Sequence, residues 1–204
     1  MSTKWIFFDL GSTLIDETKA YIHRIREMTE GTKVSYDDFE NKRIEFAGKG
    51  LDDIQETIKY FRLKKTPWHL EDEILFMDSV ETLDYLKNRG YKLGIIANQM
   101  PGVSQRLDRW GILKFFDIVV SSAELGVSKP DKRIFEKAFE LAGCLPTESV
   151  MVGDRLDNDI KPAKSLGMKT IWIRTELSKY QDSNYGKDIA DKTIDYISKL
   201  QDIF

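Results

Sequence analysis

Polar side chains that can do chemistry follow four short apolar runs of this sequence. Each is weak evidence alone, because an aspartate at a strand end commonly caps a helix or forms a turn. Several carboxylates at one place repel one another unless a cation lies among them, so the set as a whole predicts a divalent metal site. The side chains concerned are Asp9, Asn98, Lys129, Asp154 and Asp159.

Composition removes several other kinds of chemistry. The chain has 204 residues, with 34 acidic and 31 basic side chains and a net charge of −3, so it offers no broad basic field for nucleic acid. Cys144 is the single cysteine, which excludes an intramolecular disulfide framework and a multi-cysteine metal site. His23 and His69 have no partner at metal-ligand spacing, so we expect each to be solvated or packed. Carboxylates must therefore carry any reaction.

The sequence also bears on location. No apolar run approaches the ~18 residues of a membrane span, and the first ten residues lack the successive regions of a secretory signal. We therefore expect a cytoplasmic protein with no membrane partner and no nucleic-acid partner. The sequence leaves the oligomeric state open.

The apolar runs define the elements that must position these groups. Short runs read as buried strands, and helical patterns ending in glycine lie between them. Alternation of this kind predicts a doubly wound, Rossmann-like α/β fold, in which ligands bind beyond the carboxyl ends of parallel strands. The runs are 5–8, 93–97, 118–120, 150–152 and 170–173.

An early stretch interrupts the alternation. Residues 17–77 contain no buried-strand run but do contain amphipathic helical stripes, which predicts a small helical cap over the end of the first strand. The α/β core then comprises residues 1–16 and 78–204. Residues 178–187 are polar and are expected to form a loop. A last helix is expected to bury Ile194, Ile197 and Leu200.

Four motifs, in order and spacing, resemble those of the haloacid dehalogenase-like hydrolases. They are FFDLGSTL, GIIANQ, SKPDKRIF and VMVGDRLDND, and the likeness covers nearly the whole chain. The insertion resembles the type-one cap of that family. The resemblance implies a Mg²⁺-dependent phosphatase of a small phosphorylated metabolite, in which Asp9 attacks phosphorus and forms an aspartyl-phosphate.

The residue types suit these roles. Mg²⁺ prefers oxygen ligands and retains water, so Asp9, Asp154 and the carbonyl of Gly11 are expected as direct ligands. Asp159 is expected to act in the second shell or through water, and Asp157 is the alternative for that outer role. Lys129 is expected to hold the phosphoryl oxygens and to offset carboxylate repulsion.

Two positions depart from the family pattern. The family's phosphatases usually carry an aspartate as general acid and base two residues after the nucleophile, where this chain has Gly11. Proton transfer contributes ~10² to 10⁴-fold, so we expect substrates whose leaving group needs little protonation. Ala97 stands where the family has a serine or threonine, and Asn98 or Ser12 is expected to replace its contact with the phosphoryl group.

These departures keep a second class of function open: a catalytically weak or inactive phosphate- or metabolite-binding member of the family. Other branches fit less well. Dehalogenases work without metal, a phosphonatase needs a cap lysine for a Schiff base, with Lys49 the sole candidate, and a phosphomutase needs the missing acid even more.

Overall fold

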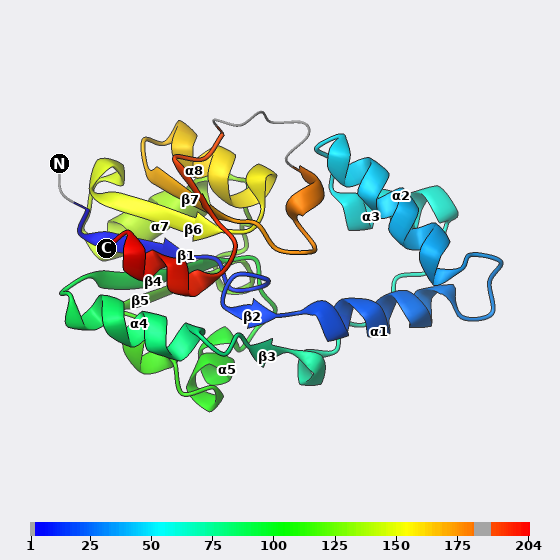
Figure 1. Cartoon of the computed structure of the whole chain (residues 1–204), viewed down its shortest axis with the longest axis horizontal. Helices are drawn as coiled ribbons and strands as arrows, with labels where there is room; N and C mark the ends of the chain where they lie inside the picture. Colours follow the sequence, from blue (N-terminus) through cyan, green and yellow to red (C-terminus); the bar gives the residue numbers. More distant parts are fainter. Residues whose placement is uncertain (1–2, 182–188) are drawn as a thin grey trace.

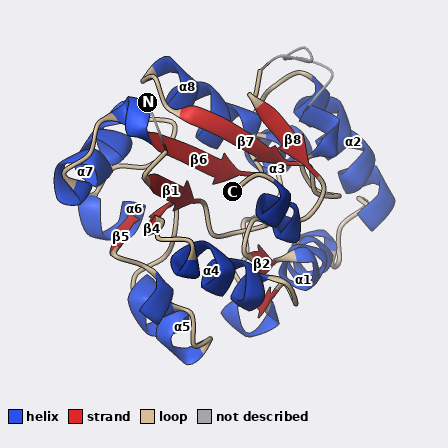
Figure 2. Cartoon of the chain, turned by 60° about the vertical axis from the view of Figure 1, so that its left-hand side comes forward, coloured by secondary structure: helices blue, strands red, loops and turns tan. Residues whose placement is uncertain are grey.

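A six-stranded parallel sheet forms the centre of the computed structural model, which describes residues 3–181 and 189–204 (Figure 2). The strand order is β5-β4-β1-β6-β7-β8, and every neighbouring pair is parallel. The predicted doubly wound fold is therefore confirmed. The strands are β1 (Trp5–Phe8), β4 (Lys92–Ala97), β5 (Ile118–Ser121), β6 (Ser149–Gly153), β7 (Lys169–Ile173) and β8 (Lys192–Ile194).

Helices cover both faces of the sheet because the strand side chains alternate between two apolar clusters. Ile6 and Phe8 pack with α4 (Ser79–Asn88), α5 (Val103–Arg109) and η6 (Ile197–Asp202). Trp5 and Phe7 pack against the opposite layer of helices. That layer contains α7 (Lys132–Ala142) and α8 (Lys161–Ser165), and the other short helical elements of the core are α6 (Ser122–Leu125), η2 (Leu113–Phe115), η3 (Pro146–Glu148), η4 (Leu156–Ile160) and η5 (Lys179–Gln181).

A helical insertion follows the first strand and extends to one side of the sheet (Figure 1). Its base is an antiparallel pair of two-residue strands, β2 (Ile15–Asp16) and β3 (Ile74–Leu75). Ile25, Met28, Phe39 and Ile58 form its own small buried cluster. The insertion contains α1 (Thr18–Thr29), α2 (Tyr36–Gly48), α3 (Asp53–Phe61) and η1 (Leu70–Asp72).

Polar caps explain where two of these helices begin. Ser35 and Asp38 form a reciprocal capping box at the start of α2, and the Asp52 side chain accepts from Gln55 N–H at the start of α3. These caps satisfy backbone N–H groups that have no partner inside the helix. The helical character predicted for this region is confirmed.

Two local expectations are wrong. Ile194 pairs with Ile173 as part of β8, and Ile197 and Leu200 lie in a 3₁₀ helix, because their three-residue spacing suits a buried 3₁₀ turn as well as an α-helix. The short strand β3 lies within 17–77, but it is not a buried run, since Ile74 is exposed and Leu75 is half-buried. Residues 179–181 form a 3₁₀ turn, and 182–188 of the expected loop lie outside the described residues.

No helix within residues 3–181 and 189–204 is long and apolar enough to cross a membrane.

Candidate active site

Three buried carboxylates meet at the carboxyl edge of the sheet. Asp9 directly follows β1 and its N–H donates to the Val152 carbonyl (2.9 Å), which fixes it beside the end of β6. Asp154 directly follows β6, and Asp159 lies in the helical turn beyond it. Ligand oxygens of the three lie within 4.8 Å of one another, and the residues are 9%, 5% and 1% exposed. The sheet thus brings together the three carboxylates that we predicted as metal-binding.

Lys129 lies among these carboxylates. Its Nζ donates to Asp9 Oδ1 and to Asp159 Oδ1, each at 2.5 Å, and the residue is 4% exposed. Burial alone would lower the lysine pKa, but the charges of Asp159 and Asp9 outweigh burial and raise it. A permanent positive charge therefore stands between two of the three acids.

The side chain of Asn98 holds the Lys129 backbone. Asn98 Nδ2 donates to the Lys129 carbonyl (2.9 Å), and the Lys129 N–H donates to Asn98 Oδ1 (2.8 Å). The amide expected to contact phosphate is thus engaged in fixing the lysine loop. Ala97, the last residue of β4, is fully buried just before it.

The electrostatics of the crevice favour a bound cation. Burial, followed by the neighbouring carboxylates, raises the pKa of Asp154 well above its usual range. Burial also raises the pKa of Asp159, to about 6, although Lys129 opposes this. Gly11 lines the same cavity of about 170 Å³, beside Asp9 and Asp154. Clustered carboxylate oxygens with room for water match the donor set of Mg²⁺.

Ser12 and Glu17 form a second polar pair at the edge of this cavity. Ser12 has a φ of 53°, the left-handed region, and its Oγ donates to Glu17 Oε2 (3.2 Å). Glu17 is 9% exposed, and burial, with Asp9 next in effect, raises its pKa to about 8. Glu17 is not among the residues predicted from the sequence. An acid at the first residue of the insertion, in a chain that has glycine at position 11, is a signal that could have indicated it.

Asp157 has another partner. Its carboxylate accepts from Arg155 Nε (2.9 Å) and Nη2 (2.6 Å), so its side chain is paired outside the carboxylate cluster. Arg155 Nη1 also lies 3.5 Å from Asp53 Oδ1 of the helical insertion. Asp53 in turn accepts from Arg43 Nη1 (2.9 Å), which also donates to the Leu177 carbonyl (3.2 Å). This chain of charges joins the insertion to the core.

A wider cavity of about 640 Å³ adjoins the crevice under the insertion. Glu17, Tyr21 and Asn98 line both spaces. Two cations, Arg24 and Lys65, line only the wider one. Arg24 lies 5.6 Å over the Trp68 ring, and within the described part of the chain its buried Nε has no hydrogen-bond partner.

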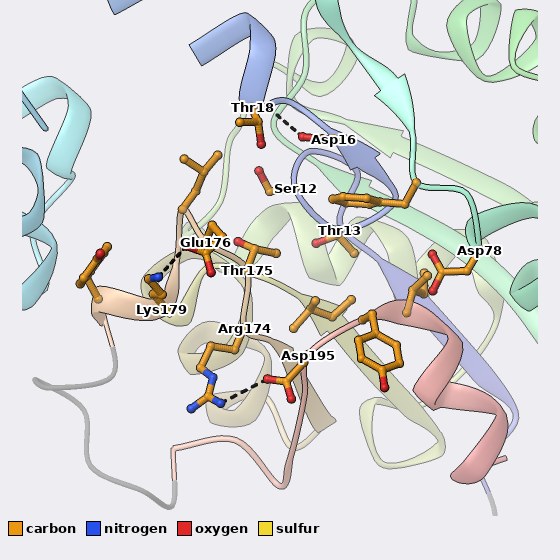
Figure 3. A pocket seen from close by; sticks show the side chains of 16 residues that line it. Ser12, Thr13, Asp16, Thr18, Asp78, Arg174, Thr175, Glu176, Lys179 and Asp195 are labelled. Carbon is orange, nitrogen blue, oxygen red and sulfur yellow. Dashed lines mark hydrogen bonds and ion pairs between the residues drawn. The ribbon is translucent and has the colours of Figure 1, made fainter. Parts of the chain in front are cut away.

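A third cavity, of about 790 Å³, lies on the other side of the loop that carries Ser12 (Figure 3). None of the three clustered carboxylates lines it. Some of its charged groups already have partners: Arg174 pairs with Asp195, and Asp16 accepts from the Thr18 N–H. The cavity shares Ser12 with the carboxylate crevice but lies outside it.

His23 and His69 are packed, as expected, but the expectation that they have no partner at metal-ligand spacing is wrong. Their rings stack with centroids 3.8 Å apart, although the residues lie on α1 and just before η1. Glu27 of α1 lies beside both, with Oε2 2.9 Å from His69 Nε2 and Oε1 3.7 Å from His23 Nε2. The turn between α3 and η1 makes this contact, which spacing along the chain cannot show.

The sequence of this chain is similar to those of known phosphatases. A glyceraldehyde 3-phosphate phosphatase of Methanothermobacter thermautotrophicus is 42% identical over 133 residues, which cover 63% of this chain and 58% of that protein. The match thus spans less than two thirds of that relative. An enzyme of the same name from Pyrococcus furiosus is 31% identical over 98% of this chain and 92% of its own length.

The fold comparison agrees. The crystal structure of a HAD phosphatase from Thermococcus onnurineus superposes with a TM-score of 0.68, at 26% identity, over 100% of this chain and 97% of that one. The family model for haloacid dehalogenase-like hydrolases matches residues 6–173, from β1 to the end of β7. The chain therefore belongs to the haloacid dehalogenase-like hydrolase family.

Proposed function

We propose that this protein is a Mg²⁺-dependent phosphatase of small phosphorylated metabolites. One observation carries the proposal: Asp9, Asp154 and Asp159 converge with Lys129 in a buried crevice that opens into a larger cavity. Relatives that match this chain are named as phosphatases. Buried like charges are costly to maintain, so their convergence supports a site built for a cation and an anion.

The reaction begins with Asp9. Its free carboxylate oxygen attacks phosphorus, a P–O bond to the Asp9 carboxylate forms, and the P–O bond to the leaving group breaks. Lys129, already within 2.5 Å of Asp9 Oδ1, offsets the repulsion between the nucleophile and the phosphate dianion. Water then attacks phosphorus of the aspartyl-phosphate, which releases inorganic phosphate and restores the carboxylate.

The carboxylates fit the metal. Asp9 and Asp154, with the Gly11 carbonyl, would hold Mg²⁺, and Asp159 would support it from the second shell. When bound, the ion supplies positive charge to the phosphoryl oxygens. Lys129 would supply a second positive charge, which belongs to the protein and stays in place between turnovers.

The wider cavity indicates the substrate class. Arg24 brings an unpaired buried N–H to a space that opens onto the crevice, and Lys65 adds a second positive charge. This favours a short, polar metabolite that presents an oxygen-rich end to the insertion. The names of the relatives support a triose phosphate such as glyceraldehyde 3-phosphate.

A phosphate-release assay tests the proposal. Wild-type protein and Asp9→Asn are incubated with 4-nitrophenyl phosphate and with glyceraldehyde 3-phosphate, with Mg²⁺ and with a chelator. We expect Mg²⁺-dependent release by the wild type and none above background by Asp9→Asn. Equal background in both proteins would reject the phosphatase and leave the phosphate-binding function that the Gly11 and Ala97 departures allow.

A further inference from the structure

The missing side chain at Gly11 leaves a space that another residue fills. A Cβ built on Gly11 would lie 2.5 Å from both carboxylate oxygens of Glu17 and 2.6 Å from its carboxyl carbon. The Glu17 carboxyl thus occupies the position into which a Gly11 side chain would project. Gly11 is not among the residues with positive φ, so its backbone does not itself demand glycine.

The local structure holds Glu17 in this position. It is the N-cap residue of α1, yet its side chain makes no capping hydrogen bond and instead receives Ser12 Oγ. Its carboxyl therefore does not cap the helix and is directed toward Ser12 and position 11. It lines both the carboxylate crevice and the wider cavity. A leaving group passing from phosphorus into the wider cavity would pass this carboxyl.

We propose that Glu17 is a catalytic residue that replaces, from the first turn of the insertion, the proton-transferring side chain absent at Gly11. The proposal rests on the proposed phosphatase function. As phosphorus transfers to Asp9, the Glu17 carboxyl gives its proton to the leaving oxygen, which departs as an alcohol. The resulting Glu17 carboxylate then takes a proton from the attacking water, so the cycle ends with both acids restored.

Glu17→Gln tests this role because it keeps the size of the side chain and removes the transferable proton. Toward glyceraldehyde 3-phosphate, an alkyl phosphate with a poor leaving group, we expect kcat/KM to fall about 10²- to 10⁴-fold. Toward 4-nitrophenyl phosphate, whose leaving group needs no proton, we expect a rapid burst of one nitrophenol per protein followed by slow turnover. The burst reports phosphorylation of Asp9, and the slow phase reports the lost base.

Two further variants make the test specific. Asp16→Asn is the matched control, because Asp16 is the neighbouring acid but lines the separate cavity of Figure 3; it should keep the wild-type ratio between the two substrates. Gly11→Asp/Glu17→Ala moves the carboxyl to position 11 and should regain at least tenfold of the activity toward glyceraldehyde 3-phosphate lost in Glu17→Gln. If Glu17→Gln does not fold, the activity of the double variant toward glyceraldehyde 3-phosphate still tests the proposal.

The outcomes separate this proposal from the proposed function. An active, Asp9-dependent wild type whose ratio of substrates is unchanged by Glu17→Gln would overturn the role of Glu17 and leave the phosphatase standing. A wild type with no Asp9-dependent turnover would reject the phosphatase itself.

A second site stands on independent observations in the helical insertion. The chain's two histidines meet with Glu27, and ligand atoms of the three residues lie within 4.8 Å of one another. Each ring has its other nitrogen beside a second carboxylate: His23 Nδ1 is 2.7 Å from Asp72, and His69 Nδ1 is 3.1 Å from Glu71. Carboxylates in this position orient the rings so that both Nε2 atoms face the Glu27 carboxylate.

We infer that His23, Glu27 and His69 form a Zn²⁺ site at the surface of the insertion, separate from the carboxylate crevice. Two imidazoles and a carboxylate are a common zinc donor set, with water as the fourth ligand. The partly exposed position leaves room for that water, since the His23 side chain is 44% exposed. A bound ion would tie α1 to the segment before η1.

Calorimetry of the untagged full chain with Zn²⁺, in excess Mg²⁺, tests the site. We expect a binding event that Asp154→Asn keeps and that both His69→Ala and His23→Gln weaken at least tenfold. Asp72→Asn should weaken it by about tenfold through the lost second shell. Zn²⁺ binding within twofold of wild type in both histidine variants, or no Zn²⁺ binding by the wild type, would overturn this inference.

Discussion

The carboxylate crevice and the helical insertion above it are built in different ways. In the crevice, Asp9, Asp154 and Lys129 lie in loops beyond strands of one rigid parallel sheet, all less than 10% exposed. The insertion residues Glu17 and Arg24, which line the wider cavity beside it, depend on one helix that leaves the core through a two-residue strand. In the proposed mechanism, the sheet sets where phosphorus reacts, and the insertion sets which leaving group reaches it and how it is protonated.

Charges join the two regions away from the base of the insertion, where Ile15 and Leu75 pack with the core of the sheet. The insertion's buried cluster of Ile25, Met28, Phe39 and Ile58 is separate from the clusters on either face of the sheet. The link of Arg43 and Asp53 with Arg155 bridges them. Changes in the crevice should therefore affect catalysis most, and changes in this link should affect stability most.

Among the changes that compare the two regions, Lys129→Met is expected to have the largest effect. Without the ammonium, the repulsion between the phosphate and Asp9 is no longer offset, and kcat should fall about 10²- to 10³-fold. The variant also leaves buried carboxylates unpaired, so its free energy of unfolding should drop by about 3 kcal/mol without Mg²⁺. Phosphate release and urea unfolding, with and without Mg²⁺, measure both. A variant as stable and active as the wild type would show that Lys129 does not offset the negative charge of the carboxylates.

Arg43→Met tests the link between the regions. Removing Arg43 breaks a buried ion pair and leaves Asp53 with only the more distant charge of Arg155, so the free energy of unfolding should fall by about 3 kcal/mol. In Arg43→Met/Asp53→Leu, where neither charge remains, we expect a smaller loss. Urea denaturation of both variants provides the measurement. A double variant less stable than the single one would contradict an electrostatic link.

The smallest effect is expected from Arg24→Gln. If the guanidinium holds the far end of the metabolite, KM for glyceraldehyde 3-phosphate should rise about tenfold, equivalent to about 1.4 kcal/mol of binding. KM for 4-nitrophenyl phosphate, whose nitro group is only a weak hydrogen-bond acceptor, should change less than twofold. Steady-state kinetics on both substrates decide the matter. Equal changes in both KM values would place Arg24 outside substrate recognition.

The crevice could be predicted because its residues follow buried strands. Asp9 comes immediately after an apolar run of four residues, and Asp154 follows a run of three with Gly153 between them. Parallel strands end at one edge of a sheet. Register then determines their separation, as in the Asp9 N–H bond to Val152. In this region, the position of a residue relative to the end of its strand therefore predicts which other residues lie close to it.

Glu17 and the histidine pair could not be predicted in this way. The position of Glu17 depends on where α1 begins, and no capping hydrogen bond from its side chain marks that start. His23 and His69 meet because the chain turns back after α3, a tertiary contact with no periodic signal. The prediction for Ile194 was wrong for a related reason. An apolar residue three positions before Ile197 fits the end of the edge strand β8 as well as it fits a helix.

Trapping the covalent intermediate tests the central claim most directly. Glu17→Gln is mixed with 4-nitrophenyl phosphate and Mg²⁺, quenched in acid within milliseconds, digested and analysed by mass spectrometry. The account predicts phosphate on the peptide that contains Asp9, at close to one per protein, and none when Asp9→Asn is added to the variant. Turnover without phosphate at Asp9, or phosphate on another residue, would contradict it.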